Sequence, residues 1–183
     1  FRDEELRERA EKWLYFGLET KSGYENSVAQ KWWEFDISCF GHRAVMNDIT
    51  AAIGLEQFKK LPMYMEKRAQ VHNFYNEALS DLQWLDLPEP IAPDCTSSYY
   101  FYHIQTKNNT RDQLAKYLRD NDIYTTYRYF PLHRVPGYHV SGAFENADYA
   151  ADNTLCLPMH QSLSQQDVEK VVEKIRQFGK ENC

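Results

Sequence analysis

Three closely spaced prolines divide this chain into two differently patterned parts. The stretch LPEPIAPD, residues 87–94, places Pro88, Pro90 and Pro93 within six residues. Proline has no N–H to donate and clashes inside a helix, so this stretch can form neither a helix nor an inner strand. The chain before it carries helical periodicity, whereas the chain after it alternates between strand and helix patterns.

The first residues already follow a helical pattern. One apolar stripe at helical spacing consists of Leu6, Ala10, Trp13, Leu14 and Gly17. Acidic and basic residues occupy the other positions, so this helix needs a partner surface. Because the chain opens on Phe1 within this pattern and not on methionine, we expect a segment of a longer chain. Residues 21–40 are irregular, which predicts a loop with at most a short strand.

Further helices are predicted between this loop and the prolines. Asn47 or Asp48 can cap the first of them. The residues expected to face inward on it are Ile49, Ala52, Ile53 and Phe58. Pro62 suits the first turn of another helix. The inward stripe of that helix is Val71, Phe74, Tyr75, Ala78, Leu79 and Leu82.

The part after the prolines predicts a small sheet covered by helices. Three segments have strand composition: SSYYFYHIQT (97–106), IYTTYRYF (123–130) and TLCLP (154–158). Between them, Thr110 can cap one helix and residues 142–153 suit a short second one. Ser164 with Asp167 forms a capping box for a last helix, whose inward stripe is Val168, Val171, Val172 and Ile175. The fold class is therefore α/β, with a small mixed or antiparallel sheet and helices packed against it.

Composition excludes several classes of function. The net charge of -6 gives no general attraction for nucleic acid or for anionic lipid. No apolar run approaches the roughly 20 residues that span a bilayer. The four cysteines contain no CxxC pair, so we expect reduced thiols in a cytoplasmic protein. Cys156 and His160 are separated by a proline, which leaves no case for a metal site.

Four segments together resemble one enzyme family. They are FGHRAVMNDITAAIGLEQFKKL, KRAQVHNFYNEAL, YRYFPLHRVPGY and LCLPMHQSLSQQDVEKVVEKI, and they span most of the chain from Phe40 onward. In this order and spacing they resemble the C-terminal portion of the DegT/StrS-type sugar aminotransferases. Those are fold-type I enzymes that use pyridoxal 5'-phosphate (PLP) to aminate keto groups on nucleotide-linked sugars, in cell-surface polysaccharide or amino-sugar biosynthesis.

The resemblance implies a domain organisation and a set of partners. Residues 1–46 would be a connecting helix and loop, and residues 47–183 the C-terminal small domain, including the long helical segment 47–82. In the family, the Schiff-base lysine lies in an N-terminal large domain, and nothing in this sequence matches that segment. The resemblance therefore implies a homodimeric complete enzyme with a nucleotide-sugar substrate, and no transamination by this chain alone.

Arg43 is the cofactor-binding residue that the resemblance suggests. In the family, the loop before this helix crosses the dimer interface and reaches the cofactor phosphate of the neighbouring subunit. Its usual patterns are Gly-Tyr-Asn-Tyr-Arg-Met and Gly-Tyr-Lys-Tyr-Asn-Met. Aligning Gly41 and Met46 puts Arg43 at the Asn or Lys position, where a guanidinium can bind phosphate with paired donors. Val45 replaces the second polar residue, which puts a second contact in doubt.

The segment around PLH supplies the substrate-binding residues that the resemblance suggests. Pro131 ends the predicted strand, so His133 would project from a loop. In the family this loop lies near the sugar or the diphosphate, with Tyr129 and Arg128 beside it. Arg128 and Arg134 would be the diphosphate partners. The alternative for His133 is that it caps a neighbouring backbone group.

Three functions of different classes are compatible with parts of this pattern. The first is the C-terminal domain of a PLP-dependent nucleotide-sugar aminotransferase. The second is a related module without catalysis, retained for dimerisation or ligand binding. The third, RNA binding through the aromatic strand Tyr99–Tyr102, is disfavoured by the net charge and by the lack of a Lys/Arg-Gly-Phe type motif.

Overall fold

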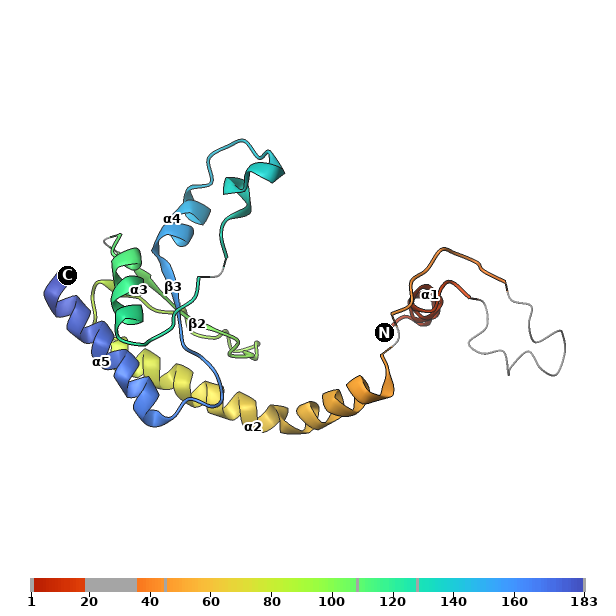
Figure 1. Ribbon diagram of the computed structural model, residues 1–183, viewed down its shortest axis with the longest axis horizontal. Helices are drawn as coiled ribbons and strands as arrows, with labels where there is room; N and C mark the ends of the chain where they lie inside the picture. The colour runs from red at the N-terminus through yellow and green to blue at the C-terminus, as the bar shows by residue number, and fades with distance from the viewer. Residues whose placement is uncertain (1, 19–35, 45, 108, 128, 183) are drawn as a thin grey trace. The chain divides into compact units, whose positions relative to one another are not determined.

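The computed structural model describes residues 2–18, 36–44, 46–107, 109–127 and 129–182. Figure 1 shows their helices and strands along the chain. They form two compact units, Phe1–Lys59 and Lys60–Cys183. The predicted loop of residues 21–40 lies mostly outside the described residues.

The first unit contains α1 (Glu4–Leu14), which begins at Asp3. The Asp3 carboxylate accepts a hydrogen bond from the Leu6 N–H at 3.1 Å and so satisfies one free donor of the first turn. The large side chains of the predicted apolar stripe, Leu6, Trp13 and Leu14, are exposed, with Leu6 and Trp13 each 51% accessible. The prediction that Gly17 belongs to this helix is wrong. Its φ of 77° places it in a left-handed turn beyond the helix end.

The long helix α2 (Asp48–Leu79) begins as the sequence predicts. The Asn47 side chain accepts from the Thr50 N–H at 2.9 Å, which identifies Asn47 as the cap. The prediction of a second helix beginning at Pro62 is wrong, because α2 continues through this residue. Because Pro62 has no N–H, the Phe58 carbonyl loses its helical hydrogen bond. Both residues are exposed, so water can satisfy that carbonyl.

The two halves of α2 differ in burial. Val71, Tyr75 and Leu79 are buried in the second half, as predicted. In the first half, the prediction of an inward face is wrong: Ile49, Ala52, Ile53 and Phe58 are all exposed. The three large side chains among them are 61–76% accessible. Periodicity predicted this stripe correctly as apolar, but it cannot show whether another surface covers it.

The second unit is built on a three-stranded antiparallel sheet in the order β1-β2-β3. The strands are β1 (Leu85–Asp86), β2 (Tyr102–Thr106) and β3 (Thr154–Leu157). Leu85 pairs with Thr106, and Tyr102 pairs with Leu157. Helices α3 (Arg111–Asp120), α4 (Glu145–Asn153) and α5 (Gln165–Asn182) complete the unit, with α3 and α5 side by side (Figure 1). The prediction of a small mixed or antiparallel sheet with packed helices is confirmed, and the sheet is antiparallel.

Two strand predictions need correction. β2 begins at Tyr102 and not at Ser97, because its partner β3 ends at Leu157 and the next residue, Pro158, has no N–H to donate. The predicted strand 123–130 is reduced to one bridge, in which Thr126 exchanges two backbone hydrogen bonds with Cys156. β1 was not predicted, because two residues are too few to show alternation.

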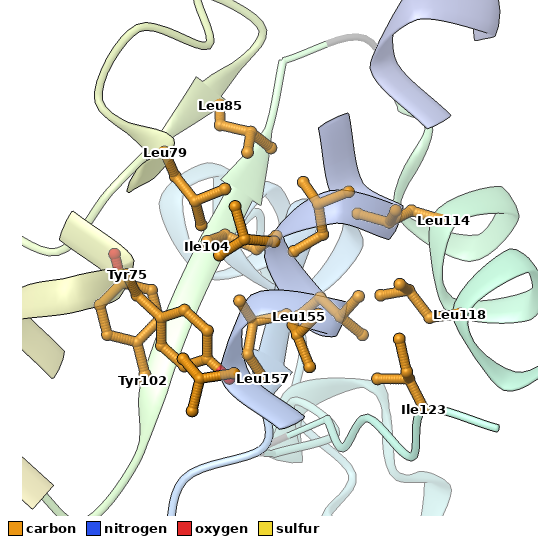
Figure 2. Close-up of a cluster of buried hydrophobic side chains, with 14 of the residues drawn as sticks. Tyr75, Leu79, Leu85, Tyr102, Ile104, Leu114, Leu118, Ile123, Leu155 and Leu157 are labelled. Atoms are coloured by element: carbon orange, nitrogen blue, oxygen red, sulfur yellow. The ribbon is translucent and has the colours of Figure 1, made fainter. Parts of the chain in front are cut away.

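One continuous core fills the space between the sheet and the helices (Figure 2). Tyr75 of α2 packs on Tyr102 of β2 with ring centroids 4.9 Å apart. Ile104 of the central strand is fully buried, and α3 contributes Leu114 and Leu118. From α5, the predicted stripe Val168, Val171, Val172 and Ile175 is buried together with Phe178.

The helix caps of this unit differ in how closely they match the sequence patterns. The Ser164–Asp167 capping box is confirmed: the Ser164 N–H donates to the Asp167 carboxylate at 2.9 Å, and the Asp167 N–H donates to the Ser164 hydroxyl at 3.2 Å. Thr110 precedes α3 as predicted, but its side chain makes no capping hydrogen bond and its buried hydroxyl has no partner.

Replacing Ile104 with Ala should lower the free energy of unfolding by about 2–5 kcal/mol, since it leaves a cavity in a fully buried position. Ile53→Ala on the exposed part of α2 is the matched control and should change it by less than about 0.5 kcal/mol. Urea denaturation followed by circular dichroism measures both. A loss at Ile53 as large as that at Ile104 would contradict the burial described here.

Candidate functional site

The loop that carries Arg43 is fixed to the end of α1 by backbone hydrogen bonds. The His42 N–H donates to the Trp13 carbonyl at 2.7 Å, and the Ala44 N–H donates to the Leu14 carbonyl at 2.9 Å. Carbonyls in the last turn of a helix have no partner within the helix, so the loop satisfies groups that would otherwise need water. Arg43 lies between these two anchors, in an antiparallel bridge with Tyr15.

Gly41 permits the close approach of this loop to the residues after α1. A Cβ added at Gly41 would lie 2.4 Å from the Trp13 carbonyl oxygen and 2.6 Å from the Gly17 nitrogen. Both are backbone atoms, which cannot move aside as a flexible side chain can. Gly41 is therefore required here for steric reasons. In the sequence analysis it served only to align the loop with the family's motif.

The Arg43 side chain is exposed. The neighbouring His42 ring packs edge-on against Trp13, with centroids 5.1 Å apart. Because neighbouring side chains of an extended segment point to opposite sides, Arg43 is directed away from that contact. Within the described part of the chain, no carboxylate forms an ion pair with Arg43. An exposed guanidinium on an anchored backbone is a suitable phosphate ligand.

The predicted substrate-binding residues lie in the second unit, on a segment that leaves the sheet and returns through α4 (Figure 1). Two short 3-10 turns, η1 (Leu132–Arg134) and η2 (Pro136–Tyr138), form its far end. Tyr129 is 71% accessible. Arg128, the predicted diphosphate partner next to it, lies outside the described residues.

His133 and Arg134 both contact α4. The His133 Nε2 is 2.7 Å from the Asp148 Oδ1, and the ring packs against Phe144 with centroids 4.8 Å apart. The Arg134 Nε donates to the same Asp148 oxygen at 2.6 Å, while Nη1 and Nη2 donate to Asp152 at 2.6 and 2.9 Å. His133 thus binds a side chain and does not cap a backbone group, and Arg134 is held by two carboxylates.

The two aspartates are stabilised as carboxylates by this arrangement. Hydrogen bonds from His133 and then Arg134 lower the pKa of Asp148, and hydrogen bonds from Arg134 lower the pKa of Asp152. A folded pKa below the unfolded value of about 3.9 means that these contacts stabilise the fold fully above that pH. Their contribution is lost as the pH falls through the folded pKa values. At neutral pH both aspartates are therefore charged.

A separate cavity of about 480 Å³ lies at the end of β3, where α2 and α5 meet the loop after the strand. Its polar lining includes Arg68, His160 and Lys170, and the Nε of Arg68 is buried without a partner. Asp122 and Asp167 line the same cavity and offset the positive charge. None of the predicted site residues that the structure describes lines it.

The described residues offer few groups for covalent or metal chemistry. None of their lysines is buried, and Lys59 forms an exposed ion pair with Glu56. They contain no group of three or more His, Cys, Asp or Glu side chains arranged to hold a metal ion. Among the described residues, Cys39, Cys95 and Cys156 form no disulfide. No described helix is long and apolar enough to cross a membrane.

Sequence reasoning missed the residues that hold the predicted ones in place. Asp148 and Asp152 lie one turn apart on α4 and together bind the adjacent pair His133 and Arg134. The available signal was two acids at i and i+4 on a helix that follows two neighbouring basic residues. That signal is common on surface helices and does not by itself identify a partner.

The comparison with known families covers nearly the whole chain. The sequence model of the DegT/DnrJ/EryC1/StrS aminotransferase family matches residues 1–176. The chain belongs to this family. The predicted resemblance is confirmed, and the segments that carried it extend through both units.

Curated members of the DegT/DnrJ/EryC1/StrS family are similar along the whole chain. It is 37% identical over 175 residues to the dTDP-4-dehydro-2,3,6-trideoxy-D-glucose 4-aminotransferase of Saccharopolyspora spinosa, an alignment that covers 95% of this chain and 46% of that protein. It is 26% identical over 188 residues to the spore coat polysaccharide biosynthesis protein SpsC of Bacillus subtilis, covering 97% and 48%. The chain thus spans about half the length of these relatives, which is consistent with a C-terminal portion.

Solved structures of family members have the same fold. The aminotransferase TlmJ from Streptoalloteichus hindustanus superposes with a TM-score of 0.86 at 41% identity, covering 99% of this chain and 46% of that one. The PLP form of the sugar aminotransferase Spr1654 from Streptococcus pneumoniae superposes with a TM-score of 0.83 at 21% identity, covering 99% and 45%. The fold is that of fold-type I aminotransferases.

Gly41→Ala should detach the Arg43 loop from α1, because the new methyl group would overlap the Trp13 carbonyl. We expect the His42 and Ala44 amide protons to exchange with solvent at least about tenfold faster, as measured by hydrogen-exchange NMR. Gly54→Ala is the control, since nothing lies within 4 Å of its added Cβ. Equal exchange in the Gly41 variant and the wild-type chain would show that the loop tolerates a side chain.

Proposed function

We propose that this chain is the C-terminal part of a PLP-dependent aminotransferase that acts on a nucleotide-linked keto sugar. The observation that carries the proposal is the family match over residues 1–176. The named relatives support the substrate class: one aminates a dTDP-linked keto sugar, and another is a GDP-perosamine synthase from Escherichia coli O157:H7, 26% identical over 83% of this chain. The pathway would be cell-surface polysaccharide or amino-sugar biosynthesis, with a cytoplasmic location.

The proposal divides the site between this chain and an N-terminal large domain. PLP supplies, when bound, the electron sink through which an amino group is transferred. A lysine that binds it covalently would come from the large domain, since the lysines of the described residues are at least partly exposed. Arg43 fits the phosphate, because it is exposed and the residues on either side of it are fixed by backbone hydrogen bonds to Trp13 and Leu14.

The complete enzyme would be a homodimer in which Arg43 reaches the cofactor phosphate of the other subunit. His133, Tyr129 and Arg128 would lie at the sugar and diphosphate of the substrate. Arg134, also predicted as a diphosphate partner, has its donors engaged by Asp148 and Asp152. Its contribution is therefore proposed to be the orientation of the His133 segment.

In the complete enzyme, Arg43→Ala should weaken PLP binding on the order of tenfold to a hundredfold. The variant loses a charge-assisted contact worth about 1.5–3 kcal/mol. Arg43→Lys should recover part of the loss, because lysine keeps the charge but not the paired geometry. Fluorescence titration of the apoenzyme with PLP measures both. Unchanged affinity in Arg43→Ala would remove Arg43 from the cofactor site.

Mixed dimers test whether Arg43 acts across the subunit interface. At a PLP concentration too low to saturate Arg43→Ala, mixing that subunit with one that lacks the catalytic lysine should restore one working site per mixed dimer. The lysine-less subunit would supply its intact Arg43 to the lysine site of the other subunit. If mixed dimers form and no activity returns, Arg43 acts within its own subunit.

The 183-residue chain alone should bind PLP without selecting one lysine. Because no described lysine lies in a preformed site, borohydride reduction after incubation with PLP should label several exposed lysines weakly. Peptide mapping by mass spectrometry measures the distribution. One dominant labelled lysine would contradict the proposal that the lysine that binds PLP covalently lies in the large domain. A lysine-bearing half encoded immediately upstream would decide against the alternative of a module without catalysis.

A further inference from the structure

The His133 ring is held on its face and at one edge by the start of α4. Phe144 covers the face, with ring centroids 4.8 Å apart and an angle of 33° between the planes. The Asp148 Oδ1 lies 2.7 Å from Nε2. Only 16% of the His133 side chain remains accessible, so the ring cannot turn freely. A side chain fixed in this way has one edge bound by the protein and one edge left for another group.

Arg134 connects the same turn to α4 through all three guanidinium nitrogens. Nε binds Asp148, and Nη1 and Nη2 bind the two oxygens of Asp152. Since the two aspartates are one helical turn apart, one planar guanidinium can bridge them. The cluster contains one positive and two negative charges when His133 is neutral. Because all three of its guanidinium nitrogens are engaged by these carboxylates, Arg134 is disfavoured as a ligand of the diphosphate.

The hydrogen-bond chemistry determines which His133 nitrogen is bound. A carboxylate can only accept hydrogen bonds, and Asp148 is a carboxylate at neutral pH because His133 and Arg134 lower its pKa. The His133 Nε2 must therefore carry the proton and donate it to Asp148. Among the described residues, no hydrogen bond uses the His133 Nδ1. In a neutral ring this nitrogen is an acceptor, and in a protonated ring it is a donor.

We infer that Asp148 is a positioning residue that fixes His133 with Nε2 as donor and presents Nδ1 to the nucleotide-sugar substrate. Arg134 and Asp152 hold Asp148 and the turn in place, and Arg134 does not bind the diphosphate. This inference rests on the proposed function for its substrate, but its geometric part concerns this chain alone. The two parts can therefore be tested separately.

The geometric part is tested by NMR of the 183-residue chain labelled with ¹⁵N. Long-range ¹H–¹⁵N spectra at neutral pH should show a proton on the His133 Nε2, shifted downfield and slow to exchange with water. Asp148→Ala should abolish this slow proton and make His133 resemble the exposed His139. Asp120→Ala removes an equally charged, exposed aspartate from α3 and should leave the signal unchanged.

Two results would overturn the geometric part. One is a His133 ring protonated on Nδ1 with Nε2 as acceptor, and the other is a slow proton that survives in Asp148→Ala. Neither depends on aminotransferase activity. Failure of the proposed function, seen as no transamination of any nucleotide-linked keto sugar by the complete enzyme, would leave this result intact.

Steady-state kinetics of the complete enzyme distinguishes two possible roles of Arg134: holding the turn that carries His133, and binding the diphosphate. If Arg134 and Asp152 hold the turn that carries His133, Asp152→Asn should lower kcat/KM by about tenfold, because the turn loses an ionic contact to α4 and the substrate-contacting side chain is misplaced. Arg134→Lys should behave similarly, because lysine cannot bridge both carboxylates. If Arg134 were a diphosphate ligand, Asp152→Asn would free its donors and would raise kcat/KM or leave it unchanged. That outcome would overturn the inference.

Discussion

The second unit depends on the contact between Tyr75 of α2 and Tyr102 of β2. Their rings pack 4.9 Å apart, and each phenol has its own acceptor: the Pro158 carbonyl at 3.1 Å for Tyr75 and the Asn76 side chain at 2.8 Å for Tyr102. Burial raises the pKa of both phenols, so both stay neutral. This pair joins the helix, the central strand and the end of β3 at one point. The register Tyr102↔Leu157 then aligns the sheet, and α3 and α5 close the core over it.

Features encoded within a few residues could be predicted from the sequence, and features that depend on distant partners could not. The Asn47 cap, the Ser164–Asp167 box and the inward stripe of α5 are local, and all three are present. The strand predicted at residues 123–130 has suitable composition, but β3 offers it a partner only at Cys156. Pro62 was interpreted as the first turn of a new helix because proline is favoured there, but an exposed helix can continue through a proline when water replaces the lost hydrogen bond.

The same distinction applies to the candidate site. Residue type and family pattern were enough to propose Arg43 and His133, since they concern single positions in a recognisable order. The contacts that determine what these residues can do were not predictable. Arg43 depends on Gly41 fitting against the Trp13 carbonyl, and His133 depends on Asp148, 15 positions further along the chain. Such pairings follow from the packing of whole elements, which local sequence patterns do not reveal.

The exposed apolar side chains of the first unit relate the fold to the proposed function. Ile49, Ile53 and Phe58 are 61–76% accessible, although burying one such side chain is worth about 1.5–3 kcal/mol. By contrast, the side chains that form the core of the second unit are buried, and Tyr75, Ile104 and Leu118 are fully buried. A continuous stripe of large, exposed apolar side chains on one helix is typical of a surface that another subunit or domain covers. The chain spans about half the length of its relatives, and under the proposed function the large domain or the second subunit would cover this stripe. In this arrangement, backbone hydrogen bonds to α1 would be enough to position the Arg43 loop. The Arg43 guanidinium would then be available to bind phosphate in the assembled enzyme.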